Sequence, residues 1–419
     1  MLIGTGTPAA GQRGRDGQNL KKLFKPIKRF LRGLFSTTEL LWYRAAARRG
    51  CAGGTRVTVI QDCHVGDFLA ALPFFQRLRD FYGCKLTLVS DKRIEPLAMA
   101  SGCFGEFVGL DMRRISSYRH WLRRGRALRR LRKLESRVLV QKYSVGGTSL
   151  EDLLAVVVPA AEKFGVESKK TDSNGGCRLY GRLLRRNFTR LYRYDEARNL
   201  LENENAYCAM ICGEELADPV GDLKCYEPLP ERDAELGRYA LVIVGADDPR
   251  RRWEPEKFAL VAARYLAAEP SCRVLFSGTE AEQKIIAEVI AAMPEAVRSR
   301  VKVRAAQKDV LSSLKRLMSD VRDAEWVLTG DTAPLHIAAK YGVKCFCITG
   351  GWHWGYFSPC REYRSVTCLN REMPCYGCFS ECIYPGAPFR CLKEVPAETV
   401  WETIRNDMET AGKEMLHEA

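Results

Sequence analysis

The sequence predicts an α/β protein with two Rossmann-like domains, each built on a parallel β-sheet covered by helices. Short apolar segments rich in β-branched residues alternate with amphipathic helical segments from residue 56 onward. A polar segment with several prolines and glycines interrupts this pattern at residues 217–237, and the alternation then restarts. Because alternating strands and helices form parallel sheets, the two series predict two domains that face each other.

The first series belongs to a predicted N-terminal domain, residues 51–225. Its strands are predicted at residues 56–63, 85–91 and 138–143. A helix is predicted at residues 67–83, and Pro73 should kink it because proline removes a backbone hydrogen bond.

A linker is predicted at residues 226–238, before a C-terminal domain at residues 239–395. The strands of that domain are predicted at residues 240–246, 273–278, 325–331 and 344–350. Its helices are predicted at residues 256–268, 279–293 and 334–342. The last segment, residues 396–419, is predicted as one more helix.

The basic charge is concentrated in two segments. The chain of 419 residues carries a net charge of +15. Residues 1–50 contain 11 basic and 2 acidic side chains, and residues 111–142 contain 12 and 2. The rest is close to neutral, so an anionic partner is expected at these two places: a membrane surface, a phosphorylated acceptor or nucleic acid.

The N-terminal segment has two parts. Residues 1–20 resemble a disordered tail in composition, whereas residues 21–34 place apolar and basic side chains on opposite faces of a helix. Such a helix either lies on an anionic membrane or packs on the protein with its basic face in solvent. The sequence has no apolar run of about 18 residues and its start lacks the apolar stretch of a secretory signal, so a cytoplasmic protein is expected.

Four junctions between a strand and the next helix carry candidate functional residues, because ligands of parallel sheets bind beyond the carboxyl ends of the strands. At the first, Gly66 permits a tight turn and Asp67 begins a helix. Asp67 is then either a helix cap or a general base directed at an acceptor hydroxyl. At the second, Arg250 and Arg251 precede Trp253 and could grip phosphate oxygens, or they form a solvated face.

The third junction is predicted to end in a helix N-terminus. Asp331 or Thr332 can cap it and Pro334 fits its first turn, so its backbone N–H groups could meet a diphosphate. His336 lies in that turn, as a ligand contact or a packed side chain. The fourth junction, residues 350–357, clusters glycines and aromatics that could stack on a base or sugar, or could fill an interdomain surface.

Together these motifs resemble glycosyltransferase family 9, the family of the lipopolysaccharide heptosyltransferases, over roughly residues 56–405. The resemblance rests on the order of Gly66-Asp67 with Leu72-Pro73, Gly245 with Arg250 to Trp253, Ser277-Gly278 with Glu280 or Glu282, and Asp331 to His336. It implies a GT-B fold and an inverting, metal-independent transfer from a nucleotide sugar. It also implies a C-terminal helix that crosses back to the first domain.

The resemblance assigns roles to single residues. Asp67 is the implied general base, and Arg251 meets the donor phosphate and stabilises the departing nucleotide diphosphate. Further donor contacts are implied for Gly66, Arg250, Gly278, Glu280, Asp331, Thr332, Ala333, Pro334 and His336. Two positions depart from the family pattern: Ala333 stands where glycine is usual, and Arg251 stands where heptosyltransferases commonly have lysine. Both departures weaken an assignment of ADP-heptose as donor.

The chain has 17 cysteines, and four of them are closely spaced near its end. Cys375, Cys378, Cys382 and Cys391 could complete a tetrahedral structural site for zinc or iron, or they are free, packed thiols. No cofactor is expected for the transfer itself.

The arginine-rich segment at residues 113–137 lies in the predicted acceptor-side domain. Arg123, Arg124 and Arg130 could bind a lipid-linked or phosphorylated glycan or the inner membrane, or they form a solvated helical hairpin. Nucleic acid is not expected, because no nucleic-acid-binding motif accompanies the segment.

The sequence therefore predicts a cytoplasmic, possibly membrane-peripheral glycosyltransferase that moves a heptose or related sugar to a lipopolysaccharide or other cell-surface glycan. Two alternatives stay open at this point. One is an enzyme that glycosylates a protein hydroxyl, and the other is a nucleotide-sugar-binding protein without turnover. A basic scaffold for membranes or nucleic acid would leave the strand-end motifs unexplained.

Overall fold

A computed structural model describes residues 37–43, 54–145, 150–167, 178–246, 248–305, 307, 309–378, 382–384 and 387–418. The predicted tail and basic helix at residues 1–34 lie outside these ranges. The chain forms two compact units: unit 1 contains residues 1–62, 84–92 and 105–195, and unit 2 contains residues 63–83, 93–104 and 196–419.

Unit 1 is built on a six-stranded parallel sheet with the strand order β3-β2-β1-β4-β5-β6. The strands are β1 (Arg56–Ile60), β2 (Leu86–Asp91), β3 (Phe104–Leu110), β4 (Ser136–Val145), β5 (Ala160–Glu167) and β6 (Arg190–Arg193). The first, second and fourth of these match predicted strands. The other three were not predicted, because polar and charged residues interrupt their apolar pattern, as in the β5 sequence AAEKFGVE.

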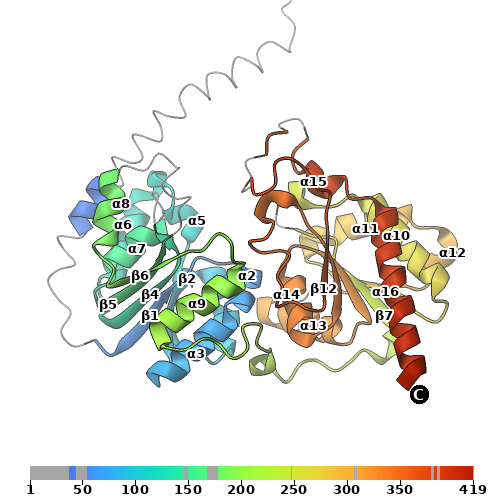
Figure 1. Cartoon of the computed structure of the whole chain (residues 1–419), viewed down its shortest axis with the longest axis horizontal. Coiled ribbons are helices and arrows are strands. Elements are labelled where there is room, and N and C mark those ends of the chain that lie inside the picture. Colours follow the sequence, from blue (N-terminus) through green and yellow to red (C-terminus); the bar gives the residue numbers. More distant parts are fainter. Residues whose placement is uncertain are drawn as a thin grey trace, which may run out of the picture. The chain divides into compact units, whose positions relative to one another are not determined.

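Helices of unit 1 pack on this sheet through an apolar core. They are α5 (Met112–Ile115), α6 (Trp121–Leu131), α7 (Leu150–Val157), α8 (Arg178–Arg185) and an additional short helix at residues 37–43. In the core, Ile60, Val89 and Leu139 of the strands meet Leu128 and Leu131 of α6 and several α7 side chains. The helix at residues 37–43 lies beside α8, where Leu40 contacts Leu184 (Figure 1).

Unit 2 contains the second six-stranded parallel sheet, with the order β12-β11-β10-β7-β8-β9. Its strands are β7 (Tyr239–Val242), β8 (Arg273–Phe276), β9 (Val301–Val303), β10 (Trp326–Gly330), β11 (Lys344–Ile348) and β12 (Val366–Leu369). All four predicted strands are confirmed, whereas the two edge strands, β9 and β12, were missed because they are short. The strand order reverses between β7 and β10, which is where open parallel sheets bind ligands.

Helices of unit 2 divide into two groups. One group contributes to a large apolar core with the sheet: α10 (Pro255–Ala268), α11 (Gln283–Ala292), α15 (Arg390–Lys393) and α16 (Ala397–Glu418). The predicted C-terminal helix is thus α16, which packs on α10 (Figure 1). The other group comprises α2 (Val65–Ala70), α3 (Leu72–Tyr82), α4 (Glu95–Ala100), α9 (Leu200–Cys212), α13 (Val310–Arg322) and α14 (Ala333–Tyr341), with α2 packed on α14 and α3 on α9.

The predicted kink at Pro73 is confirmed as a break between two helices. The helical run divides at Ala71, and Pro73 lies in the first turn of α3, where its missing N–H costs no helical hydrogen bond. The segment predicted as a linker, residues 226–238, is irregular, contains the 3₁₀ turn Ala234–Leu236 and lies within unit 2. In the part of the chain that the structure describes, every helix is too short or too polar to cross a bilayer.

Candidate functional site

The candidate site is centred on the turn between β10 and α14 in unit 2. Thr332 occupies the N-cap position of α14, but its hydroxyl lies 3.2 Å from that of Thr329 and does not cap the helix. Pro334 is in the first turn and has no N–H to satisfy. The Leu335 N–H donates to the Thr332 carbonyl at 3.1 Å, so within the described residues the Ala333 N–H is the donor of this first turn without a partner.

Gly66 allows α2 to approach this helix end closely. A methyl group placed on Gly66 would lie 3.1 Å from His336 Cδ2 and 3.5 Å from Ala333 Cα. Any larger side chain would push α2 away from α14. The first and third predicted motifs are thus direct neighbours in space, although 267 residues separate Gly66 from Ala333.

His336 is a packed side chain rather than an open ligand contact. It is 8% exposed, and its Nδ1 lies 2.8 Å from the Tyr363 hydroxyl. Burial, helped by the charge of Lys340, lowers the pKa of His336 to about 4, so the imidazole is neutral near pH 7. His336 of α14 therefore packs between Gly66 of α2 and Tyr363 of the segment that joins β11 and β12.

Asp67 lies on the third residue of α2, at the side of α2 that carries Gly66. Its Oδ2 accepts a hydrogen bond of 3.0 Å from the backbone N–H of His64, the N-cap residue. The prediction that Asp67 is the N-cap residue is therefore wrong, because His64 holds that position. The Asp67 carboxylate nevertheless accepts the hydrogen bond of the N-cap N–H. Its Oδ1 has no hydrogen-bonding partner among the described residues, and the side chain is half-buried.

Asp331 follows β10 and is electrostatically coupled to both Asp67 and Arg251. Desolvation raises the pKa of Asp331 to about 6. The Asp67 carboxylate also raises this pKa. The Arg251 guanidinium and a hydrogen bond with Ser358 lower it. The charges of Asp67 and Arg251 thus both act on the pKa of Asp331.

The three consecutive arginines after β7 have three different partners. Arg250 is exposed and forms a bidentate ion pair with Asp248, which holds the pKa of that carboxyl at about 2. Arg252 donates two hydrogen bonds, of 3.0 and 2.8 Å, to the carbonyl of Ala246 and so fixes the turn. Arg251 stacks on the buried Trp352, with its guanidinium carbon 5.0 Å from the ring centroid, and Arg250 also lies over an aromatic ring, that of Phe389, at 5.4 Å. Of these arginines, Arg251 is the one whose charge lowers the pKa of Asp331. Of the predicted phosphate contacts, Arg251 is thus better placed than Arg250.

The glycines of the fourth junction make room for aromatic rings. A methyl group on Gly350 would lie 1.9 Å from Trp352, and one on Gly351 would lie 2.1 Å from Tyr376. Trp352 is 2% exposed and packs edge-on against Phe389, with 5.0 Å between ring centroids. Trp352 therefore supports Arg251 from the core and has no surface left on which a base or sugar could stack.

A carboxylate covers the ends of β7 and β8. A methyl group on Gly245 would overlap Glu282 Oε1 at 1.7 Å, and one on Gly278 would lie 3.0 Å from Glu282 Oε2. Glu282 also accepts hydrogen bonds from the backbone and hydroxyl of Thr279. Glu280, the predicted donor contact, is exposed on the same 3₁₀ turn, so Glu282 is the acidic residue that these two glycines accommodate.

The four cysteines near the end of the chain form no disulfide with one another. Cys391 Sγ accepts a hydrogen bond from the Gly351 N–H at 3.3 Å. Desolvation raises the pKa of the Cys391 thiol, and the nearby Cys375 and Cys378 thiols raise it further. In the described ranges no three His, Cys, Asp or Glu side chains are arranged to hold a metal ion, and the zinc or iron site stays a prediction. Metal analysis of the purified protein tests that prediction.

In unit 1, the predicted anion-binding arginines do not behave alike. Arg124 is buried and forms a bidentate ion pair with Glu39, with both N–O distances at 2.7 Å, and it also donates to the Ile115 carbonyl. The prediction that Arg124 binds an acceptor is therefore wrong: its role is to join two helices. Arg123 and Arg130 are exposed on α6.

Sequence reasoning missed two side chains of the site. Ser358 is buried and bonds to Asp331, and Tyr363 is buried against His336. Both lie in the irregular segment between β11 and β12, where no periodic pattern or spacing marks a functional residue.

Comparisons with known proteins agree with the motifs. Residues 196–385 match glycosyltransferase family 9 (heptosyltransferase). Lipooligosaccharide heptosyltransferase 2 of Campylobacter jejuni strain NCTC 11168 is 24% identical over 156 residues, which are 37% of this chain and 46% of that protein. The matched region thus spans about half the length of this curated relative.

Solved structures share the fold at low sequence identity. The family 9 glycosyl transferase from Veillonella parvula superposes with a TM-score of 0.61 at 17% identity, covering 85% of this chain and 98% of that one. E. coli heptosyltransferase WaaC with ADP-2-deoxy-2-fluoro heptose gives a TM-score of 0.58 at 16% identity, covering 84% and 99%. The chain shares the GT-B fold of these structures, and its residues 196–385 match the model of glycosyltransferase family 9.

Proposed function

We propose that the chain is an inverting glycosyltransferase in which Asp67 is the general base. The observation that carries this proposal is the packing of α2 on the start of α14, where Gly66 lies against Ala333 and where Oδ1 of the adjacent Asp67 has no hydrogen bond from the described residues. The charges of Asp67 and Arg251 both act on Asp331, which directly precedes this helix. A base, a cation and a helix N-terminus are the groups that displacement of a nucleotide diphosphate requires.

The reaction is one displacement at the anomeric carbon. Oδ1 of Asp67 takes the proton of an acceptor hydroxyl as its oxygen bonds to that carbon. The bond from the carbon to the diphosphate oxygen breaks, and the nucleotide diphosphate leaves with the electron pair. Arg251 and the Ala333 N–H at the start of α14 stabilise the negative charge that develops on the leaving group. No atom in this reaction changes its oxidation state, so the transfer needs no redox partner.

The partners of the charged side chains support these roles. Arg251 is held from behind by Trp352, so its guanidinium is positioned before a ligand arrives. Arg250 is neutralised by Asp248 and Arg252 is bound to backbone, so neither competes for the phosphate. The Asp67 carboxylate is anchored at one oxygen by His64, which fixes the direction of the other.

For the substrates, we propose a nucleotide-activated heptose or related sugar as donor and a lipopolysaccharide or other cell-surface glycan, lipid-linked or phosphorylated, as acceptor. The heptosyltransferase activity named for the Campylobacter relative and the ADP-2-deoxy-2-fluoro heptose bound to E. coli WaaC support this class. A protein hydroxyl as acceptor and a binding protein without turnover are the two other outcomes that the experiment below distinguishes. We also propose a cytoplasmic location.

The first experiment combines ligand binding with turnover. Thermal unfolding of the purified full chain is measured with nucleoside diphosphates and nucleotide sugars, because a ligand at 100 times its dissociation constant adds about 2.7 kcal/mol to the native state. The same panel is applied to Asp67→Asn, which keeps an oxygen to accept the His64 N–H while removing the base. Transfer to glycan and protein acceptors is followed by mass spectrometry.

Each outcome has a separate meaning. Stabilisation by one nucleotide series in both proteins, with transfer only by the unsubstituted chain, supports the enzyme and names the donor class. Stabilisation without transfer to any acceptor favours the binding protein. Transfer that persists in Asp67→Asn removes Asp67 from the role of base, and no stabilisation by any nucleotide contradicts the donor site.

A further inference from the structure

Unit 1 exposes its large apolar side chains in one place. Four large apolar residues of the described part of unit 1 are strongly exposed: Leu41 (44%), Trp42 (74%), Trp121 (69%) and Leu122 (52%). The first two are on the helix at residues 37–43 and the other two begin α6. Exposure of two indoles together is unusual for a surface that meets only water.

The two segments that carry these side chains are joined directly. The buried ion pair between Arg124 and Glu39 connects α6 to the helix at residues 37–43. Trp121 is one helical turn before Arg124, and Trp42 is one turn after Glu39, so both indoles lie within a turn of the same ion pair. Buried Leu40 and Leu128 fix the inner sides of the two helices, which leaves their outer sides to solvent.

The charge around these indoles is of one sign. Residues 112–134 contain no aspartate or glutamate, and α6 exposes Arg123, Arg126, Arg129 and Arg130. Exposed indoles beside arginines match the chemistry of a bilayer interface, where indole rings lie at headgroup level and basic side chains meet anionic headgroups. A water-soluble protein partner would not require this excess of one charge, and no nucleic-acid-binding motif is present.

We infer that the surface formed by residues 37–43 and α6, here called the indole–arginine surface, binds the headgroup region of an anionic lipid bilayer. Trp42 and Trp121 insert into the interface and the α6 arginines contact lipid phosphates. The surface is distinct from the site around Asp67 and acts without a nucleotide sugar. The result of a lipid-binding assay on this surface is therefore independent of whether the proposed sugar transfer is correct.

The test uses the full chain and vesicles of neutral phosphatidylcholine, with or without one quarter of anionic phosphatidylglycerol. Co-sedimentation is compared for the unsubstituted protein, W42S/W121S and R123E/R126E. The matched controls are F81S/M99S, which replaces two exposed apolar residues of unit 2, and K284E/K302E, which makes the same change in charge elsewhere. Arg124 is left in place so that the two helices stay joined.

We expect both test variants to lose at least tenfold in partitioning to anionic vesicles, since each basic residue near such a surface contributes a factor of about five. The controls should change partitioning by less than twofold. Binding should weaken as salt rises, because the phosphate contacts are screened. Unfolding temperatures of all variants are measured to show that they fold.

Quenching by brominated lipids reports directly on the two indoles and separates this surface from residues 21–34. In the unsubstituted protein, brominated anionic vesicles should quench the fluorescence of Trp42 and Trp121, identified by its loss in W42F/W121F. Vesicle binding without that quenching would overturn the proposal, as would equal binding to neutral vesicles. Binding of a nucleic acid duplex in preference to anionic vesicles would overturn it in favour of a nucleic-acid surface.

Discussion

Two runs of arginine look alike in the sequence and differ in what they do. Arg250, Arg251 and Arg252 follow β7 in unit 2, and Arg123, Arg124 and Arg126 lie on α6 in unit 1. In each run one arginine has a distinct role: Arg251 reaches the candidate site and Arg124 is buried in an ion pair. The comparison shows that the position of an arginine on its turn or helix decides which partner it binds. Its membership of a basic run does not.

The largest expected effect separates Arg251 from its neighbour. If Arg251 stabilises the leaving diphosphate, Arg251→Ala should lower kcat/KM for transfer by about 10² to 10³-fold, the loss typical when one charge-stabilising donor is removed. Arg250→Ala should change it by less than threefold, because that guanidinium is paired with Asp248. Steady-state kinetics check this, and equal losses in the two variants would contradict the assignment.

The corresponding comparison in α6 concerns stability. Arg124→Ala leaves the Glu39 carboxylate without its partner in a site where the two side chains are only 8% and 14% exposed. We expect unfolding by urea to show a loss of about 3 kcal/mol. Arg123→Ala serves as the control and should stay within about 0.5 kcal/mol. A loss of similar size at both positions would show that the buried ion pair is not what distinguishes them.

A smaller effect tests the interaction of Arg251 with Asp331 through the pH dependence of stability. The folded pKa of Asp331 is raised to about 6 and its ordinary value is 3.8, so the stability linked to this group is present below pH 4 and is lost as pH rises through 6. Asp331→Asn should remove this decline and gain on the order of 1 kcal/mol at pH 7. His336 contributes the opposite slope: its folded pKa is about 4 and its ordinary value is 6.5, so the stability linked to it is present above pH 6.5 and is lost as pH falls through 4.

Arg251→Ala should shift the Asp331 transition upward, because Arg251 holds that pKa down. Thermal unfolding of both variants between pH 4 and 8 measures these slopes. An unchanged transition in Arg251→Ala would mean that the two side chains do not interact.

The smallest expected effect concerns the ring beneath Arg251. Trp352→Phe keeps a buried aromatic ring but weakens the cation–π contact, so the Kd of a nucleoside diphosphate should rise about threefold to fivefold, corresponding to about 1 kcal/mol or less. Trp354→Phe is the matched control, since Trp354 packs on Tyr376 instead. Calorimetric titration decides between them, and equal changes would show that the contact with Arg251 carries no binding energy.

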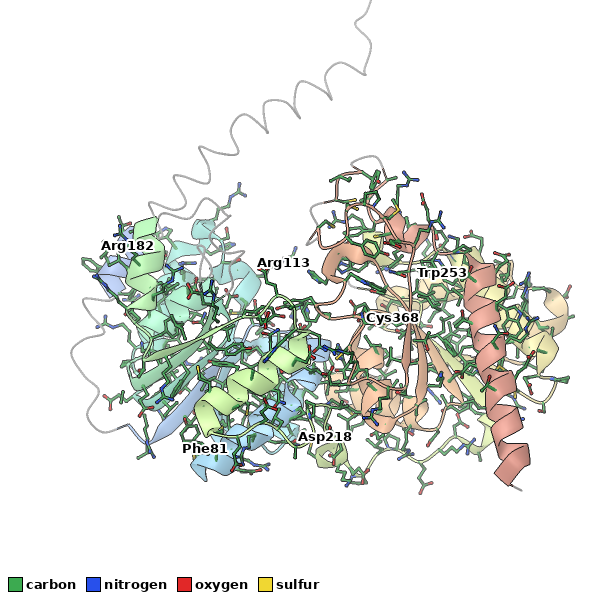
Figure 2. All side chains as sticks on the ribbon, in the orientation of Figure 1. Phe81, Arg113, Arg182, Asp218, Trp253 and Cys368 are labelled. Atoms are coloured by element: carbon green, nitrogen blue, oxygen red, sulfur yellow. The ribbon has the colours of Figure 1, made fainter. Side chains whose placement is uncertain are left out.

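Much of the fold could be predicted from the sequence. Strands rich in apolar side chains, such as β1, β2 and β10, are buried on both faces over nearly their whole length, and that pattern is visible without a structure. Edge strands and strands with charged residues were missed: Cys368 lies on β12, an edge strand of four residues (Figure 2). Short edge strands depend on pairing with a neighbour, and the sequence alone does not show that neighbour.

The candidate site was predicted in part. Gly66, Asp67, Arg251, Asp331 and Thr332 were found because each follows a strand or starts a helix, where local rules apply. Ser358, Tyr363 and the choice of Glu282 over Glu280 were not found, since they depend on which side chains meet across loops.

The sequence by itself determined the alternation of strands and helices, the break at Pro73 and the position of the helix end at Thr332, because these follow from periodicity and backbone chemistry within a few residues. Only the tertiary structure decided that Gly66 lies against His336, that Arg124 is buried with Glu39 and that Trp352 supports Arg251. These contacts join residues between 85 and 270 positions apart in the chain. Partners at that distance are selected by packing of the whole unit, which no local pattern records.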